Sequence, residues 1–290
     1  MKQIELDSTG TLISAIGFGS MHLSISGRPD ELTAHKVLNA SLDAGVNFID
    51  TADVYCIDDN DIGHSERLIA AVLATRDDRD RIRVATKGGL RRPNGAWKSD
   101  GSPGHLRGAC AASRAALNTE QIFLYQLHAV DRDVPLEKSV EALAELKREG
   151  RILHVGLSNV AVEQIEAARR IVDVVSVQNR LNPFFRESVD NGVVRYCADS
   201  GITFLAYSPV GGGRLVKKIP RYVVLQRIAQ VHDVSPYAVV LAWVRAQGRT
   251  VVPIPSATKV QTARDSARTA DLALSADEIA EIDATEFSTA

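Results

Sequence analysis

Four side chains that can hold, donate or orient a proton stand at or just beyond the ends of apolar runs of strand length. They are Asp50 at the end of VNFID, Tyr55 five residues later in FIDTADVYC, Lys87 at the end of RIRVATK, and His128 at the end of IFLYQLH. A free phenol has a pKa of about 10, too high for efficient proton donation near neutral pH. A nearby lysine ammonium would lower that pKa, and an aspartate would keep a buried lysine charged. With a histidine N–H that orients a carbonyl oxygen, such a set predicts protonation of that oxygen while another group attacks the carbon.

The residue types around these four side chains also restrict which group attacks the carbonyl carbon. No Ser or Cys stands beside a base that would activate it as a nucleophile. His22, Asp50 and His128 lack the clustered spacing of metal ligands, so no metal site is predicted. Hydride is the leading candidate, and a metal-dependent barrel hydrolase stays as an alternative.

The elements that must position these groups follow from the hydropathy pattern. After a short hairpin over residues 1–13, turned by STG, strand-length apolar runs alternate with helix-period segments in eight units. The predicted strands are 13–20, 46–50, 81–87, 122–128, 151–158, 172–178, 202–208 and 250–255. Such alternation predicts a parallel sheet, and eight units predict an α/β fold of the (β/α)8 TIM barrel type, one domain over residues 1–290.

Further predictions concern the helices and the competing fold. Helices are expected over 30–45, 65–74 with Ser65 as N-cap, 104–117, 136–150, 162–171, 187–201, 221–234, 235–248 and near 260–268. A doubly wound sheet is disfavoured because GFGSMHL (17–23) lacks the third glycine of a dinucleotide-binding fingerprint.

Barrel enzymes carry their chemistry at the C-terminal ends of the strands. Taken singly, each candidate has an ordinary explanation, such as a capping aspartate, a lysine with its ammonium in water, or a packed tyrosine. Four such residues at one barrel mouth favour a functional site. The later strands end in further polar pairs, which are Ser158-Asn159, Gln178-Asn179 and Tyr207-Ser208.

Bulk composition excludes several classes of protein. The 290 residues carry a net charge of −2 without a long basic block, so neither nucleic acid nor an anionic membrane is an expected partner. The pair Arg91-Arg92 is interpreted as part of a solvated loop. Cys56, Cys110 and Cys197 are far apart and odd in number, which favours free thiols in a reducing compartment. With no signal-like or membrane-length apolar run, a cytoplasmic protein is expected, either a monomer or a small homo-oligomer.

The chain resembles the aldo-keto reductases in seven ordered motifs between about residues 13 and 286. GVNFIDTADVY resembles the family's G-x-x-x-x-D-T-A-x-x-Y signature, ATKGG its lysine strand and LYQLHAVD its histidine strand. GRILHVGLSNV, VSVQNRLNP, AYSPVGGG and PIPSATKVQTARDSA resemble its cofactor-binding segments. The resemblance implies that Tyr55 is the general acid, that Lys87 paired with Asp50 tunes it, and that His128 orients the carbonyl.

The same resemblance implies binding of a nicotinamide cofactor, with NADP(H) favoured over NAD(H). Ser158, Asn159 and Gln178 would hold the carboxamide, and Tyr207 would stack on the ring. The remaining cofactor contacts would come from Gly19, Ser20, Met21, Ser208, Ser256, Lys259 and Asp265. Lys259 would contact a 2′-phosphate, and Asp265 the adenine amine. A small carbonyl or alcohol compound would be the substrate, with pyridoxal as one option, because some bacterial members with a similar arrangement reduce it.

Two departures from the family pattern limit the transfer of substrate preference. The family's Y-G step is Tyr55-Cys56, followed by IDDNDI (57–62), a longer loop that we expect to border the substrate mouth. Cys56 is interpreted as a small loop filler rather than a redox-sensitive thiol. Trp97 and His22 are expected to line the pocket. A non-catalytic cofactor sensor is the second alternative function, disfavoured by the intact set of four.

Overall fold

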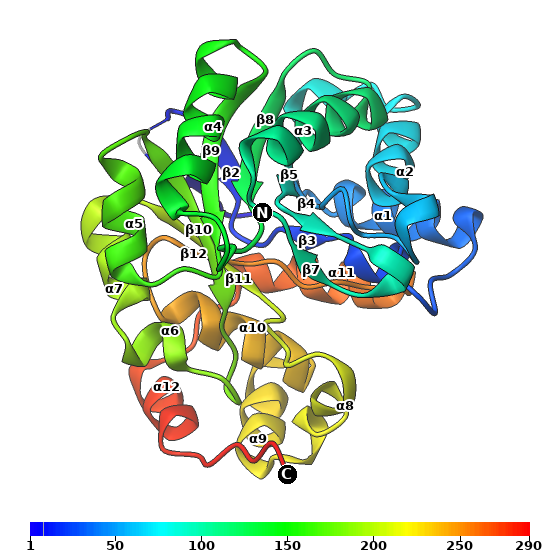
Figure 1. Ribbon diagram of the computed structural model, residues 1–290. Coiled ribbons are helices and arrows are strands. Elements are labelled where there is room, and N and C mark those ends of the chain that lie inside the picture. Colours follow the sequence, from blue (N-terminus) through cyan, green and yellow to red (C-terminus); the bar gives the residue numbers. More distant parts are fainter. Residues whose placement is uncertain (8) are drawn as a thin grey trace.

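The centre of the protein is an eight-stranded parallel sheet that curls into a barrel ringed by helices (Figure 1). The structure is a computed structural model that describes residues 1–7 and 9–290. In sheet order the strands are β3 (Phe18–Gly19), β4 (Phe48–Asp50), β5 (Arg83–Gly88), β8 (Ile122–Leu127), β9 (Ile152–Ser158), β10 (Val174–Arg180), β11 (Thr203–Tyr207) and β12 (Val251–Pro253). The amides of Gly17 and Gly19 donate to the carbonyls of Pro253 and Pro255 over 3.0 and 2.9 Å, joining the first strand to the last. The predicted (β/α)8 barrel is confirmed.

Helices cover the outer face of the sheet, and apolar side chains fill the space between the two layers. Along the chain they are α1 (Glu31–Asp43), α2 (His64–Leu73), α3 (Pro103–Leu117), α4 (Leu136–Arg148), α5 (Val162–Arg169), α6 (Glu187–Asp190), α7 (Val193–Ser200), α8 (Gly213–Val216), α9 (Val223–His232), α10 (Pro236–Ala246), α11 (Val260–Arg268) and α12 (Ala276–Asp283). Helices α8, α9 and α10 all fall between β11 and β12, and together with α12 they build the lower part of the view in Figure 1. None of the helices in residues 1–7 and 9–290 combines the length and the apolar character needed to span a membrane.

The predicted N-terminal hairpin is confirmed as β1 (Gln3–Glu5) and β2 (Leu12–Ser14), which pair antiparallel. Within its predicted STG turn, Ser8 lies outside the described residues. Leu6 and Ile13 are buried in one apolar cluster with residues from several barrel strands, including Phe48 and Leu124. The hairpin therefore covers the end of the barrel opposite the strand C-termini, so the interior is accessible from the other end.

Side chains inside the barrel change from apolar to polar toward the C-terminal ends of the strands. Phe48 and Ala85 belong to the interior apolar cluster. Two residues further on, the strands β4 and β5 carry Asp50 and Lys87. Because side chains alternate between the two faces of a strand, residues two apart point the same way. The charged pair is thus stacked directly on an apolar floor that excludes water from below.

Three local predictions are corrected by the structure, and one helix was missed. The predicted strand 13–20 divides into β2 and the short β3, since β2 pairs with β1 instead of joining the barrel. Ser65 lies inside α2, which is preceded by the left-handed Gly63, and the Ser65 hydroxyl bonds Ser20 instead. The predicted helix 187–201 breaks at Gly192, whose φ is +81°. Helix α12 was not predicted, although its Ser275–Glu278 capping box was a readable signal.

Candidate active site

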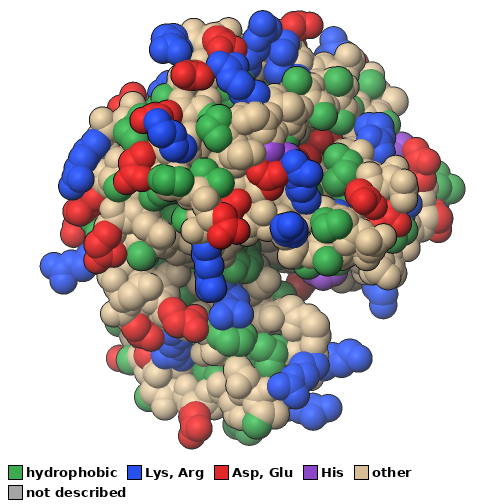
Figure 2. All heavy atoms as spheres, in the orientation of Figure 1, with side chains coloured by type: hydrophobic (Ala, Val, Ile, Leu, Met, Phe, Trp, Pro, Cys, Tyr) green, Lys and Arg blue, Asp and Glu red, His purple; other side chains and the backbone are tan. Residues whose placement is uncertain are grey.

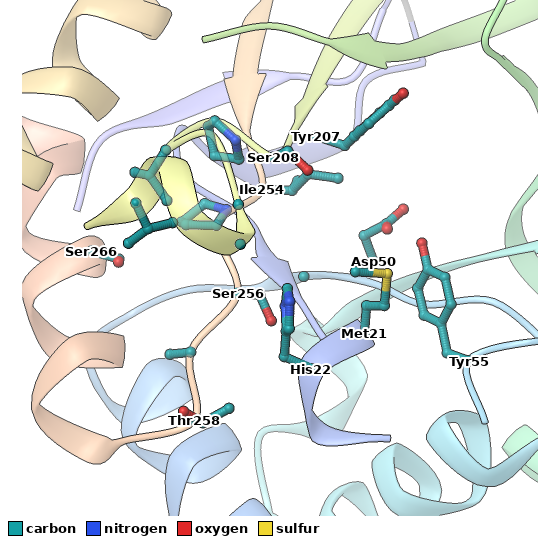
Figure 3. A pocket seen from close by; sticks show the side chains of 18 of the residues that line it. Met21, His22, Asp50, Tyr55, Tyr207, Ser208, Ile254, Ser256, Thr258 and Ser266 are labelled. Carbon is teal, nitrogen blue, oxygen red and sulfur yellow. The ribbon is translucent and has the colours of Figure 1, made fainter. Parts of the chain in front are cut away.

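A cavity of about 960 Å³ lies at the C-terminal ends of the barrel strands. Asp50, Tyr55 and His128 contribute to its wall. In Figure 2 the surface is hollowed between the part built by α8, α9 and α10 and the rest of the molecule. The cavity is elongated, with Asp50 and Tyr55 toward one end and Thr258 toward the other (Figure 3). On the face shown in Figure 2, basic and acidic side chains are interspersed.

Lys87 is the centre of a buried hydrogen-bond network at the Tyr55 end of the cavity. Its Nζ donates to Asp50 Oδ2 at 2.6 Å, to the Thr51 carbonyl at 2.8 Å and to the Tyr55 hydroxyl at 3.0 Å. The lysine side chain is 0% exposed and that of Asp50 is 2% exposed. All three protons of the ammonium therefore have acceptors, and one of these is a carboxylate. This arrangement holds a charged lysine against a phenol away from bulk water.

The second oxygen of Asp50 is also occupied. Gln178 Nε2 donates to Asp50 Oδ1 at 2.7 Å, and Gln126 Nε2 donates to the same atom at 3.2 Å. Gln126, on β8, was not predicted as a site residue. Its position two residues before His128 was the available signal, because residues two apart share a strand face. Two amides thus stabilise the carboxylate that keeps Lys87 charged.

The electrostatics of Tyr55 and Lys87 differ in one respect from the sequence-based prediction. Burial alone would lower the pKa of Lys87, but Asp50 and Tyr55 together raise it above its ordinary value. Burial raises the pKa of Tyr55, the Lys87 ammonium lowers it, and Asp50 raises it again, so the pKa ends above its ordinary value. The predicted lowering by Lys87 is present, but the loss of solvation outweighs it, so the net shift is upward. Tyr55 consequently keeps its proton at neutral pH.

His128 faces Tyr55 as a neutral ring. Burial, assisted by the Lys87 charge, holds the pKa of His128 well below its usual range. The rings of His128 and Tyr55 are 5.8 Å apart, edge to face. Its Nδ1 is buried without a hydrogen-bond partner among the described residues. A neutral imidazole has one N–H to donate, so this side chain can orient a carbonyl oxygen without competing for the phenolic proton.

The polar residues that end β9 and β11 form a second network beside the first. Tyr207 donates its hydroxyl proton to Asn159 Oδ1 at 2.9 Å. Asn159 Nδ2 lies 3.0 Å from the His128 carbonyl and 3.1 Å from Ser158 Oγ, and Ser158 Oγ donates to the Gln178 carbonyl. Asn159 has a φ of +58°, a left-handed conformation that turns its side chain back over the barrel. The structure thus brings Ser158, Asn159, Gln178 and Tyr207 to one wall of the cavity, as their strand positions predicted.

The first strand contributes to the wall unevenly. Gly19 and Met21 line the cavity. A Cβ on Gly19 would lie 2.8 Å from the Ile254 carbonyl oxygen, so this close approach of β3 to β12 requires glycine. Ser20 lies behind the wall and is fully buried, with its hydroxyl bonded to the Asp50 carbonyl and to Ser65. Its role here is to support the strand rather than to meet a ligand.

The end of the cavity away from Tyr55 carries groups suited to a phosphate. Ser256, Lys259 and Asp265 line it, whereas Ser208 lines the wall beside Tyr207 (Figure 3). The Ser256 hydroxyl is buried without a partner among the described residues, and Lys259 directly precedes α11, whose N-terminal amides favour an anion. Asp265 Oδ2 already accepts a hydrogen bond from Ser235 at 2.6 Å. The unpartnered hydroxyl and the helix terminus fit a phosphate-bearing ligand lying along the cavity.

The loop after Tyr55 corrects one prediction and bears on the interpretation of Cys56. Among the described residues none of 57–62 lines the cavity, so the expectation that this loop borders the substrate mouth is wrong. The loop is instead tied outward by Asp61, which pairs with Arg28. Cys56 is buried, and desolvation raises its pKa to about 11, which confirms the interpretation as a filler.

A hairpin that was not predicted borders the Tyr55 end of the cavity. Strands β6 (Leu90–Arg91) and β7 (Lys98–Ser99) pair antiparallel, and residues 90–99 are called here the 90–99 hairpin. It brings Trp97 onto the cavity wall, and β3 leads into the segment that brings His22 there, as predicted for both residues. Arg92 is buried, so the interpretation of both arginines as solvated is wrong for this one. Within the described part of the chain, no group of three or more His, Cys, Asp or Glu side chains is placed to hold a metal ion.

The fold and the site together define a barrel protein with a phenol, a lysine and a carboxylate bonded to one another at one end of a long cavity. Residues 15–286 match the Aldo/keto reductase family, and the chain belongs to this family of oxidoreductases. An uncharacterized oxidoreductase of Schizosaccharomyces pombe is 34% identical over 278 residues, covering 94% of this chain and 86% of the relative.

Solved structures share the whole architecture. A glycerol dehydrogenase from Gluconobacter oxydans superimposes with a TM-score of 0.85 at 25% identity, over 97% of this chain and 94% of that one. An aldo/keto reductase from Klebsiella pneumoniae, solved with NADP and acetate, gives a TM-score of 0.81 at 24% identity, over 98% and 95% of the two chains. Similarity at the latter level shows the fold alone.

Proposed function

We propose that the protein is a carbonyl reductase in which Tyr55 donates the proton and a nicotinamide cofactor, preferentially NADPH, is the electron source. The observation that carries this proposal is the position of the Lys87 ammonium, 3.0 Å from the Tyr55 hydroxyl and 2.6 Å from Asp50 at one end of the cavity. A charged lysine held against a phenol stabilises the phenolate that proton donation leaves behind.

The mechanism follows from the charges of these groups. When bound, the reduced cofactor supplies a hydride, which forms the new C–H bond at the carbonyl carbon. The electron pair of the C=O π bond moves to oxygen, and Tyr55 gives that oxygen its proton, leaving an alcohol and a phenolate. The phenolate is stabilised by Lys87, which stays protonated because Asp50 faces it. His128 orients the carbonyl oxygen by donating its N–H.

The cofactor would lie along the whole cavity. Ser158, Asn159 and Gln178 would hold the carboxamide, and Tyr207 would stack on the ring. The remaining contacts would come from Gly19, Met21 and Ser208 along the cavity wall, supported from behind by Ser20, and from Ser256, Lys259 and Asp265 at the adenine end. The preference for NADP(H) over NAD(H) rests on Lys259 at the start of α11, since a 2′-phosphate there would meet both an ammonium and free helix amides. Titration of wild type and Lys259→Met with both cofactors should show tighter NADPH binding that the variant loses. Equal NADPH affinity in the two proteins would refute the role of Lys259.

The substrate would be a flat aromatic aldehyde, of which pyridoxal is one. Tyr55, Trp97 and His128 stand at steep angles to one another, with centroid separations of 5.8 to 6.5 Å. Met21 and Leu90 add apolar surface to the same wall. Aromatic rings in this arrangement offer edges and faces to a planar guest. Because Cys56, Cys110 and Cys197 are all free thiols, we also propose a reducing, cytoplasmic location.

The test is a Tyr55→Phe variant measured in two ways. Cofactor binding, followed by quenching of protein fluorescence, should be unchanged, whereas NADPH-dependent reduction of benzaldehyde should fall by about 10²- to 10⁴-fold. Tyr196→Phe, at a tyrosine that bonds Arg169 on the outer helices, is the matched control and should keep full activity. Full activity in Tyr55→Phe would sink the mechanism. Tight cofactor binding by wild type without turnover of any carbonyl compound would indicate a cofactor sensor instead.

A further inference from the structure

Arg92 is a buried cation without a carboxylate partner. The residue is only 6% exposed, and among the described residues no Asp or Glu lies within ion-pair distance of it. Its Nε and Nη1 have no hydrogen-bond partner in the same residues. The preceding residue differs completely, since Arg91 is exposed and its Nε lies 2.6 Å from Asp100 Oδ2. A buried guanidinium is costly to keep without a counter-ion, so its contacts require an explanation.

The contacts of Arg92 join two segments that border the catalytic residues. Its Nη2 donates to the carbonyls of Cys56 and Ile57 at 3.3 and 3.1 Å, directly after Tyr55. The centre of its guanidinium lies 3.9 Å from the centroid of the Trp97 ring, on the 90–99 hairpin. One side chain therefore fixes the Tyr55 segment and the aromatic wall opposite it relative to each other.

Trp97 depends on this contact for its orientation. Its side chain is 49% exposed, so packing alone constrains it weakly. The ring is nevertheless placed edge to face against both Tyr55 and His128, with centroids 6.5 and 6.4 Å away. A guanidinium stacks flat on an indole, combining cation–π attraction with a planar fit that lysine cannot reproduce. The stack determines where the ring stands over the reacting groups.

We propose that Arg92 is a positioning residue that holds Trp97 over the substrate and thereby sets the preference for aromatic over small aliphatic aldehydes. This inference rests on the proposed carbonyl reduction. Arg92 does not line the cavity and touches neither substrate nor cofactor, so it acts through Trp97. An aromatic substrate fills the space beneath Trp97, whereas acetaldehyde sits between Tyr55 and His128 without reaching the indole.

Kinetics with two aldehydes separate this role from a merely structural one. In Arg92→Met the KM for benzaldehyde should rise about tenfold, a change of the size of one desolvated cation–π contact. The KM for acetaldehyde and the Kd for NADPH should stay unchanged, whereas any fall in kcat should be the same for both aldehydes, because Arg92 also binds the carbonyls directly after Tyr55. Arg92→Lys should recover part of the loss, and Arg91→Met, at the exposed and paired neighbour, is the matched control that should behave as wild type. Combined with Trp97→Leu, Arg92→Met should cost little more, because both changes remove the same cation–π contact.

An equal rise in KM for the two aldehydes, or additive losses in the double variant, would overturn the proposal. Trp97 fluorescence gives a reading that needs no turnover: acrylamide should quench it more strongly in Arg92→Met than in wild type, after subtraction of Trp243 emission measured in Trp97→Phe. Unchanged quenching would also overturn the proposal. If Arg92→Met does not fold, Arg92→Lys is measured in its place by aldehyde kinetics, by the double-variant comparison and by acrylamide quenching. Absence of any wild-type turnover would refute the proposed reduction, and the quenching experiment would still decide whether Arg92 positions Trp97.

Discussion

Replacing Asp50 by Asn would leave Lys87 as a buried cation without a carboxylate. Asp50 Oδ2 is 2.6 Å from Lys87 Nζ, and both side chains are almost completely buried. In wild type both carboxylate oxygens of Asp50 accept hydrogen bonds, one from Lys87 and the other from Gln126 and Gln178. Asparagine has nearly the same shape, but its NH2 group would replace one of these oxygens and would face a hydrogen-bond donor. The substitution therefore removes the charge and also breaks a hydrogen bond.

The cost to stability has an upper limit set by proton release. Removing one partner of a buried ion pair typically lowers the free energy of unfolding by about 3–5 kcal/mol. Lys87 can instead lose its proton, which from an ordinary pKa of about 10.4 costs about 4.6 kcal/mol at pH 7. We expect a loss of about 3–5 kcal/mol at pH 7, a large part of the roughly 5–15 kcal/mol of a typical domain. With a urea slope of about 3 kcal/mol/M, the midpoint falls by about 1–2 M.

The loss should shrink as pH rises. In wild type the pKa of Lys87 is raised, so its contribution is fully present below the unfolded pKa and is lost only above it, as pH passes the folded value. In Asp50→Asn the folded protein holds Lys87 neutral while the unfolded chain binds a proton, so the variant gains about 1.4 kcal/mol per pH unit. At pH 9 release of the Lys87 proton costs only about 2 kcal/mol, so the loss of unfolding free energy falls to about that value.

Urea unfolding at pH 7 and pH 9, followed by circular dichroism, measures both numbers. The double variant Asp50→Asn/Lys87→Met is the control, because it removes the uncompensated charge and should regain much of the stability at pH 7. A loss below about 1 kcal/mol at pH 7, or equal losses at the two pH values, would refute the assignment of Lys87 as a charged, Asp50-dependent group.

Two further predictions follow from the direction of other pKa shifts. The kcat/KM for aldehyde reduction should stay flat from about pH 6 to pH 9. The reason is that the pKa of His128 lies well below its usual 6.5 and that of Tyr55 lies above 10. A fall in kcat/KM with a midpoint near the ordinary histidine pKa would contradict this. Cys56, Cys110 and Cys197 are buried with pKa values raised by desolvation to about 11, 11 and 12, so Ellman's reagent should react slowly with the native protein and rapidly with all three thiols in urea. A native thiol that reacts as fast as free cysteine would contradict the burial.

The sequence alone determined the barrel and the positions of its reactive strand ends. Alternating apolar runs and helix-period segments predict parallel strands, and parallel strands bring Asp50, Lys87 and His128 to the same edge whatever the details of packing. The C-terminal ends of parallel strands share one mouth of a barrel, which is why the polar residues that end them could be predicted to converge there. The family motifs then supplied the expected role of Tyr55.

The tertiary structure decided the properties that depend on surroundings. The net direction of the Tyr55 pKa shift depends on how much water is removed from the phenol, and no spacing in the sequence reports that. Ser20 and Gln126 show the same limit, since only the closed barrel turns one hydroxyl behind the wall and brings the distant amide to Asp50.

Arg91 and Arg92 show the difference most directly. They are adjacent and chemically identical, yet one is paired in solvent with Asp100 and the other is buried beneath Trp97. Arg91 is the last residue of strand β6, whereas Arg92 leads into the turn Pro93–Gly95, so the two residues differ in local backbone conformation. Which of the two side chains is buried is decided by the packing of the 90–99 hairpin against the loop after Tyr55, and that packing exists only in the folded protein.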